Sequence, residues 1–109
     1  MSMSNILENP EDQKLATLAT STLTRSGAKQ AAALRDTTGR TYVAINVASP
    51  DLNLDAVEAV FVVALASQIS GIEGVVYAGT ADAKLSVIKQ HSPQAVLFHI
   101  DANGSVARA

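Results

Sequence analysis

The fold prediction depends on residues 39–47, Gly-Arg-Thr-Tyr-Val-Ala-Ile-Asn-Val. Their β-branched and aromatic residues are typical of a strand, which we place over 41–47. A second run over 29–36 predicts the strand before it, and residues 37–39 form a tight turn because Gly39 tolerates a positive φ. The two strands therefore form an antiparallel hairpin.

Helices are predicted on both sides of this hairpin. Upstream, Asn9 is a suitable N-cap for a helix over 10–26, with Pro10 at its first position and Gly27 as its stop. Downstream, Pro50 breaks the second strand because it has no N–H to donate.

The helix that follows Pro50 is unusually apolar. Asp51 or Asn53 caps it, and it is expected to run to Ser70 with Gly71 as its stop, giving a helix over about 54–70. It carries no charge between Ala59 and Ile72. A helix that is apolar nearly all round is buried on more than one side. We therefore expect one side to pack on the sheet and the other on a partner subunit, in a homodimer or homotetramer.

The rest of the chain completes an α/β fold. We predict a strand over 74–80, a helix over 81–90, a strand over 95–100 and a final strand over 105–107. The order αββαβαββ implies right-handed crossovers and an antiparallel final hairpin. This gives a three-layer α/β/α sandwich around a mixed five-stranded sheet. Residues 1–109 form a single domain, with a flexible N-terminus over 1–8.

Composition excludes several functional classes. The 109 residues have a net charge of −2, and the eight Lys and Arg never form a run, which argues against nucleic-acid and membrane-surface binding. There are no cysteines, so thiol catalysis and Cys-based metal sites are excluded. The most apolar stretch, 59–66, is far shorter than the about twenty residues of a membrane span. With no secretory signal pattern at the N-terminus, we expect a cytoplasmic protein.

The element order and the local sequence resemble the cytidine deaminase family over roughly residues 12–106, and in particular short actinobacterial cytidine deaminase-like proteins that lack the zinc motif. Residues 39–47 are similar to the family's second strand, which ends in an Asn-x-Glu substrate clamp. Residues 54–57, Leu-Asp-Ala-Val, fall where the family begins its zinc helix with Cys-Ala-Glu or His-Ala-Glu. The resemblance implies a zinc cofactor, a nucleoside substrate and a hydrolytic deamination.

The departures from the family pattern concern the chemistry. Zinc deaminases need His or Cys ligands and a Glu that moves the proton. Here Asp55 stands at the ligand position and Val57 at the Glu position, and Glu58 lies about 100° further around the helix. Residues 79–84, Gly-Thr-Ala-Asp-Ala-Lys, replace the expected Pro-Cys-x-x-Cys, and Ala48 replaces the Glu of the clamp. The sequence therefore predicts no zinc, no other metal and no catalytic residue.

Four residues remain as candidates for a vestigial ligand pocket, namely Asn46, Asp55, Glu58 and Asp82. Asn46 either contacts a sugar hydroxyl, as the resemblance implies, or bonds the loop backbone. The acidic residues either cap the two helices or form a Mg²⁺ or Ca²⁺ site. His91 and His99, the only histidines, have no partners at ligand spacing.

The sequence thus predicts a non-catalytic, oligomeric binding or scaffold protein with a cytidine deaminase-like fold. Its partner is a nucleoside-like small molecule or another protein. The alternative is a divergent nucleoside deaminase or other hydrolase that uses Asp55, Glu58 and Asp82. A third reading is a heteromer in which this chain supports an active paralogue.

Overall fold

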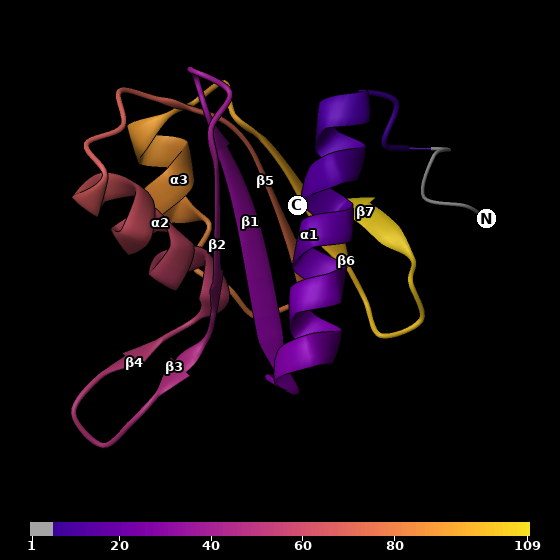
Figure 1. The fold of residues 1–109 in the computed structure, drawn as a ribbon, viewed down its shortest axis with the longest axis vertical. Coiled ribbons are helices and arrows are strands. Elements are labelled where there is room, and N and C mark those ends of the chain that lie inside the picture. Colours follow the sequence, from indigo (N-terminus) through magenta and orange to yellow (C-terminus); the bar gives the residue numbers. More distant parts are fainter. Residues whose placement is uncertain (1–5) are drawn as a thin grey trace.

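The structure, a computed structural model, describes residues 6–109. Within these residues, three helices flank a five-stranded sheet, and a short two-stranded hairpin stands apart from the sheet (Figure 1). The helices are α1 (Pro10–Ser26), α2 (Ala56–Ala66) and α3 (Ser86–His91). The strands are β1 (Gln30–Asp36), β2 (Thr41–Ile45), β3 (Val47–Ala48), β4 (Asn53–Leu54), β5 (Ile72–Gly79), β6 (Val96–Ile100) and β7 (Val106–Arg108).

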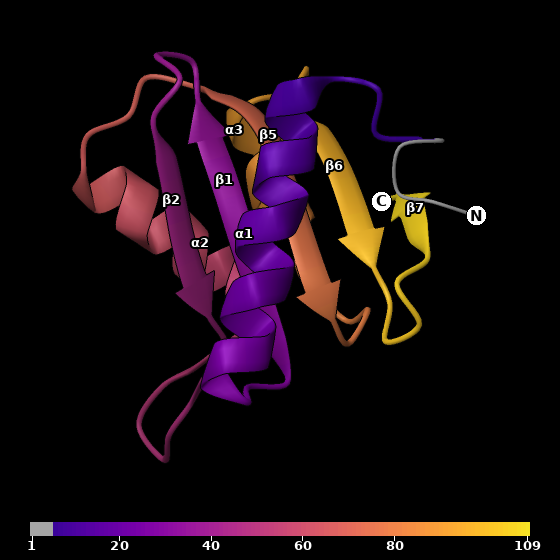
Figure 2. The same cartoon turned by 45° about the vertical axis from the view of Figure 1, so that its right-hand side comes forward.

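The main sheet is mixed and has the order β2-β1-β5-β6-β7. Only β5 and β6 pair in parallel, and the other three pairings are antiparallel. Helix α1 covers one face of the sheet, while α2 and α3 cover the other (Figures 1 and 2). Each face has its own buried apolar cluster, which includes Val76 beneath α1 and Val75 beneath α2. The predicted three-layer α/β/α sandwich with a mixed five-stranded sheet is confirmed.

The second predicted strand is divided in two. Strand β2 ends at Ile45, and the chain continues into the short hairpin of β3 and β4. This hairpin pairs Val47 with Leu54 and Ala48 with Asn53, and it extends away from the sheet (Figure 1). We call residues 47–54 the β3–β4 arm.

The predicted bounds of α2 were wrong at both ends. Asp55, not Asp51 or Asn53, is the N-cap, and the helix ends at Ala66 rather than Ser70. Its end is set by Gln68, which adopts a left-handed φ of 62°. The N–H of Gln68 donates to Leu65 O and the N–H of Ile69 to Ala64 O, which is the Schellman pattern of a helix end. Gln68 thus takes the position that we assigned to Gly71.

The third helix was also placed wrongly. It was predicted over 81–90 but begins at Ser86, so residues 80–85 are non-helical. Gly79, at a φ of +102°, directs the chain into this segment, and a Cβ there would lie 2.2 Å from Lys29 O. The sharp exit from β5 leaves residues 80–85 against the start of α2 instead of continuing into a helix.

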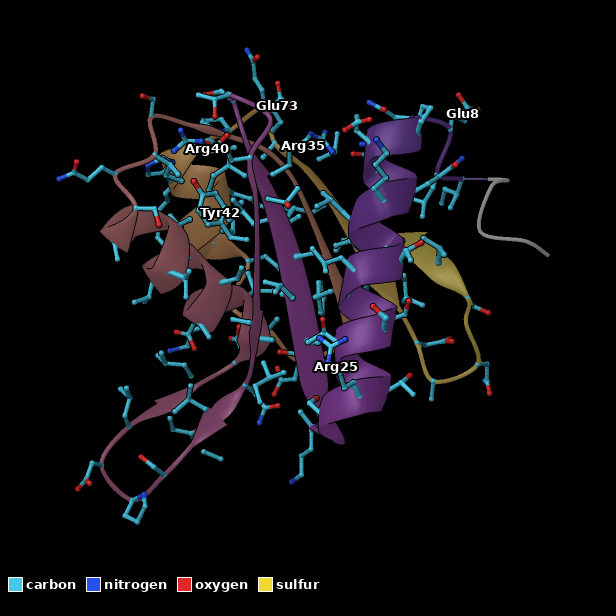
Figure 3. All side chains as sticks on the ribbon, viewed as in Figure 1. Glu8, Arg25, Arg35, Arg40, Tyr42 and Glu73 are labelled. Atoms are coloured by element: carbon cyan, nitrogen blue, oxygen red, sulfur yellow. The ribbon has the colours of Figure 1, made fainter. Side chains whose placement is uncertain are left out.

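Two polar clusters lie at the C-terminal end of β1, around its last two residues, Arg35 and Asp36. Arg35 lies between α1 and β5, bonding Asp12 Oδ1 at 2.9 Å and Glu73 Oε1 at 2.8 Å (Figure 3). Asp36 accepts bonds from Thr38, from Arg40 N–H and from the Tyr42 hydroxyl. Burial alone would raise the pKa of Asp36, but these hydrogen bonds outweigh burial and lower its pKa.

Residue Leu7 belongs to the stretch, 1–8, that we expected to be flexible. Leu7 is fully buried, and its carbonyl accepts a 2.7 Å bond from Gln13 Nε2. For residues 1–5, the expected flexible N-terminus lies outside the described residues. Among the helices of the described part, none is long and apolar enough to cross a membrane.

Candidate functional site

A pocket of about 410 Å³ opens at the end of the sheet where β1 begins and β2 and β5 finish. The first turn of α2 forms one wall, and the segment after β5 forms another. All four residues predicted from the sequence line it. The lining comprises Lys29, Gln30, Asn46, Asn53, Leu54, Asp55, Glu58, Thr80, Asp82, Ala83 and Lys84.

Gln30 forms the floor of this pocket. Its side chain is buried, and Nε2 donates to Thr80 O at 2.6 Å and to Asp82 O at 3.1 Å. Its Oε1 accepts the N–H of Ala56 at 2.7 Å. One amide therefore joins the start of α2 to the segment after β5. No sequence pattern indicated this role, since a glutamine at the start of a strand is ordinarily exposed.

Asp55 makes a second connection between the same two walls. Its Oδ1 accepts the N–H of Glu58 at 2.8 Å, and Glu58 Oε1 accepts the N–H of Asp55, so the pair forms a capping box. Its Oδ2 accepts the N–H of Lys84 at 2.8 Å. The helix-capping role that we considered for Asp55 is therefore observed, together with a bond to the opposite wall that we did not predict.

Asn46 extends the β1–β2 pairing beyond the end of β2. Its Oδ1 accepts the N–H of Gln30 at 3.1 Å, and its own N–H donates to Gln30 O at 3.2 Å. Of the two roles considered for Asn46, a backbone role is present in the structure, but the partner is the first residue of β1 and not the loop. Because its oxygen is engaged, its side-chain NH₂ is the group available to a ligand in the pocket.

Glu58 and Asp82 supply the pocket's remaining negative charge. Glu58 Oε2 lies 4.0 Å from Lys84 Nζ, and the Lys84 side chain is 74% exposed, so this ion pair is weak. Asp82 is exposed, and its backbone rather than its carboxylate bonds Gln30. Beneath the pocket, burial and then the charges of Asp55 and Asp82 raise the pKa of Tyr77. The pocket therefore combines the half-buried Glu58 carboxylate, whose Oε1 is held by the capping box, and the exposed Asp82 carboxylate with Lys29 and Lys84.

These residues do not fit the zinc site of a deaminase. Such a site needs three His or Cys ligands that leave one position open for water. Here the pocket offers amides and carboxylates, and both oxygens of Asp55 already accept backbone N–H groups. Among the described residues, no three His, Cys, Asp or Glu side chains gather closely enough to hold a metal. The same finding gives no support to a Mg²⁺ or Ca²⁺ site.

The two histidines lie outside the pocket lining. His99 Nε2 donates to Gly79 O at 2.8 Å, and its ring lies 4.7 Å from that of Tyr77. His91 meets Phe61 edge to face and contacts Ser92 Oγ. Both histidines therefore have structural partners, and neither joins the carboxylates.

Comparison with known proteins agrees with the fold. The sequence profile of the family described as "Cytidine deaminase-like" matches residues 8–104. Among solved structures, the chain is similar to the cytidine deaminase of Mycobacterium leprae, with a TM-score of 0.68 and 14% identity. The match covers 92% of this chain and 94% of that one. No curated protein sequence matches.

The sandwich thus defines an α/β protein with a cytidine deaminase-like fold, and the pocket lies at the end of its sheet. The profile match spans most of the chain, and the chain belongs to the cytidine deaminase-like family.

Proposed function

We propose that this chain is a non-catalytic member of its family, a zinc-free protein that binds a small nucleoside-like molecule and assembles as a homo-oligomer. The observation that carries the proposal is the bonding of Asp55. It stands where the family begins its zinc helix, and it joins Glu58 N–H to Lys84 N–H. The two walls that a metal would hold together are held by protein hydrogen bonds.

The pocket retains groups suited to a hydroxylated ligand. Asn46, Glu58 and Asp82 line the same pocket: the side-chain NH₂ of Asn46 is a donor, and the Asp82 carboxylate and Oε2 of Glu58 are acceptors for ligand hydroxyl and amino groups. Among the described residues, no aromatic side chain lines the pocket, so stacking on a base does not contribute. We therefore expect weak binding that depends mainly on hydrogen bonds to the sugar.

The oligomer is proposed on the surface of α2. Val62, Val63 and Leu65 are 52%, 42% and 44% exposed, which is unusual for large apolar residues on one helix. A second copy of the chain that covers this face would bury them. The helix concerned, α2, is the one that we predicted over 54–70, and its observed bounds are Ala56–Ala66.

The first experiment is metal analysis of untagged protein purified without chelators, followed by a cytidine deamination assay. We expect no stoichiometric zinc and no turnover in folded protein. Near-stoichiometric zinc would overturn the proposal. Titration calorimetry with cytidine, uridine and ribose then tests binding. We expect binding of the three to be lost in Asn46→Ala and kept in Thr17→Ala, a matched change on the opposite face of the molecule.

A second candidate is a hydrolase that uses the carboxylates, and the presence of Glu58 and the exposed Asp82 in the lining of one pocket favours it. In that case turnover of a nucleoside without metal is lost in Asp82→Asn while the melting temperature stays unchanged. A support role for an active paralogue predicts instead that a second, zinc-containing chain co-purifies.

A further inference from the structure

The outer edge of β2 is an unpaired edge of the main sheet. Strand β2 stands at the end of the sheet order, and β1 is its only strand partner among the described residues. Figure 2 shows β2 at the outer margin of the sheet, with α1 and α2 on opposite faces. An edge of this kind presents backbone N–H and C=O groups with which another extended chain can pair.

The pairing of β2 with β1 decides which backbone groups face outward. The N–H of Asn46 donates to Gln30 O, and the N–H of Asp36 donates to Arg40 O, so Asn46 and Arg40 direct these groups at β1. Residues that bond the neighbouring strand alternate with residues that do not along an antiparallel pair. The N–H and C=O groups that point outward, and that have no hydrogen-bond partner among the described residues, belong to Thr41, Val43 and Ile45.

The other edge strand of the main sheet, β7, is protected in a way that β2 is not. It has three residues, and one of them is the exposed Arg108. Short length and a charged side chain are common devices against unwanted pairing at an edge. Strand β2 has five residues, none of them charged, and its last residue, Ile45, is 38% exposed. Of the two edges, that of β2 is therefore the better suited to pairing.

A groove lies beside the same edge. Its volume is about 670 Å³, and it is lined by Thr41 and by one side of α1, including Lys14 and Leu18. Tyr42 and Ala44 pack on the cluster beneath α2, so the residues of β2 that alternate with them project toward the α1 side. A strand added to β2 would place every second side chain on this face, next to the groove.

The end of the edge at which β2 begins is basic. Arg40, immediately before β2, is exposed and forms no ion pair among the described residues, because the Asp36 carboxylate is buried and accepts other bonds. Lys14, in the groove, is 73% exposed and pairs with the exposed Glu11 at 3.1 Å. Such a surface pair contributes little, so both cations are available to an acidic partner.

We propose that the free edge of β2 binds an extended, acidic segment of another protein, which joins the sheet as an additional antiparallel strand. Three outward residues with one N–H and one C=O each allow six backbone hydrogen bonds to the segment. Antiparallel addition brings the C-terminal end of the segment to the start of β2. Its acidic residues therefore belong at that end, beside Arg40 and Lys14.

A second copy of this chain fits the edge less well. The edge strands of its main sheet are β2 and β7, and neither contains an aspartate or a glutamate. Pairing of two β2 edges would leave Arg40 and Lys14 without an acidic residue in the added strand. The inference concerns a different surface from the pocket and from α2, so it holds or fails independently of the proposed function.

The first test uses a synthetic peptide of about eight residues that alternates valine with threonine and ends in two aspartates. Fluorescence anisotropy of the labelled peptide measures its affinity for the full chain. N-methylation of its odd-numbered or of its even-numbered residues blocks one edge of the peptide and leaves the other edge free. We expect the affinities of these two forms to differ at least about tenfold, because only one edge pairs with β2. Equal affinities, or no binding of the unmethylated peptide at about 1 mM, would overturn the proposal.

Amide hydrogen exchange followed by NMR locates the contact. In the free protein we expect fast exchange at Thr41, Val43 and Ile45, and slow exchange at Tyr42 and Ala44, whose N–H groups bond β1. The peptide should slow the exchange of the first three. Slow exchange at Val43 in the free protein that depends on protein concentration would show that a second copy covers the edge, and it would overturn the proposal.

Charge reversal tests the acidic character of the partner. Arg40→Glu should weaken binding of the peptide about fivefold and strengthen binding of a matched peptide that ends in two lysines. The control Lys89→Glu, at an exposed position on α3, should change neither affinity. Circular dichroism verifies that both variants are folded. Equal binding of the two peptides to the wild type, or an unchanged affinity in folded Arg40→Glu, would overturn the acidic partner.

Discussion

Removal of the Asp55 carboxylate should loosen the pocket and destabilise the whole domain. Asp55→Ala removes the N-cap of α2, worth about 1 kcal/mol, and the bond to Lys84 N–H, worth about 1 kcal/mol. The two bonds go to different segments, so we add them to about 2 kcal/mol. Asp55→Asn is the informative comparison, because its amide oxygen still caps Glu58 N–H while its NH₂ faces Lys84 N–H, donor against donor.

The expected shifts can be measured by thermal melts followed by circular dichroism. An unfolding entropy of about 2.1 cal/mol/K per residue gives about 230 cal/mol/K for a chain of 109 residues. Each kcal/mol then lowers the Tm by about 4 °C. We expect Asp55→Ala to melt about 8 °C below the wild type and Asp55→Asn about 4 °C below it. A chelator should move none of these values, because hydrogen bonds rather than a metal join the two walls.

Two results would refute this reasoning. If Asp55→Ala melts within about 2 °C of the wild type, Asp55 does not hold the walls together. If the chelator lowers the Tm of the wild type but not of Asp55→Ala, then Asp55 binds a metal and the proposed function fails with it. Asp51→Ala in the arm turn is the matched control, and it should change the Tm little because it makes no cap.

Three further changes test other parts of the structure. Gln68→Gly should stabilise the protein by about 0.5–1 kcal/mol, since glycine tolerates the φ of 62° at the end of α2; an unchanged or lower denaturation midpoint would argue against a strained Gln68. Tyr42→Phe removes a bond to the ionised Asp36, whose pKa is lowered, so the stability that Asp36 contributes is present above a pH of about 4 and is lost as pH falls through its folded pKa. Urea titrations should therefore show a deficit for Tyr42→Phe at pH 7 that shrinks in acid, and a pH-independent deficit would contradict the assignment. Asp12→Ala leaves the buried Arg35 with one carboxylate and should cost about 3 kcal/mol; a urea midpoint near that of the wild type would show that Glu73 suffices.

Most of the fold could be predicted because its signals are local. Asn9, Pro10 and Gly27 define α1 through the backbone geometry that each residue favours, and the structure places its ends at the predicted residues. The β1–β2 hairpin likewise follows from strand-forming residues around a turn with Gly39 at a φ of 90°. These features depend on residues close together in sequence.

The errors arose where distant contacts decide the local structure. Residues 81–85 have acceptable helix propensity, but Asp55 and Gln30 hold their backbone groups from across the pocket. A side chain some 29 positions away competes with the helix for the N–H of Lys84. Propensity is a weak prior against such contacts, so α3 begins later than predicted.

The four candidate site residues could be identified only with the family resemblance. Spacing alone puts Asp55 and Glu58 on one helix face, whereas Asn46 and Asp82 join them through the sheet pairing of β1 with β2 and β5. Gln30, which links all of these segments, carries no motif. Its role depends on its burial between the start of α2 and the segment after β5, and this burial cannot be predicted from the identity of one residue.

The way in which the segment after β5 is anchored separates stability from binding in this pocket. Its anchors are mostly backbone groups, since Gln30 bonds Asp82 O, Asp55 bonds Lys84 N–H and Tyr77 bonds Ala81 O. The side chains of Asp82 and Lys84 therefore contribute little to the stability of the segment, and both line the pocket. Substitutions at these two positions should alter ligand preference at nearly constant stability, whereas substitutions at Gln30 should disturb both. Because backbone hydrogen bonds position this segment, we expect substitutions of its side chains to change which ligand is preferred while the fold stays the same.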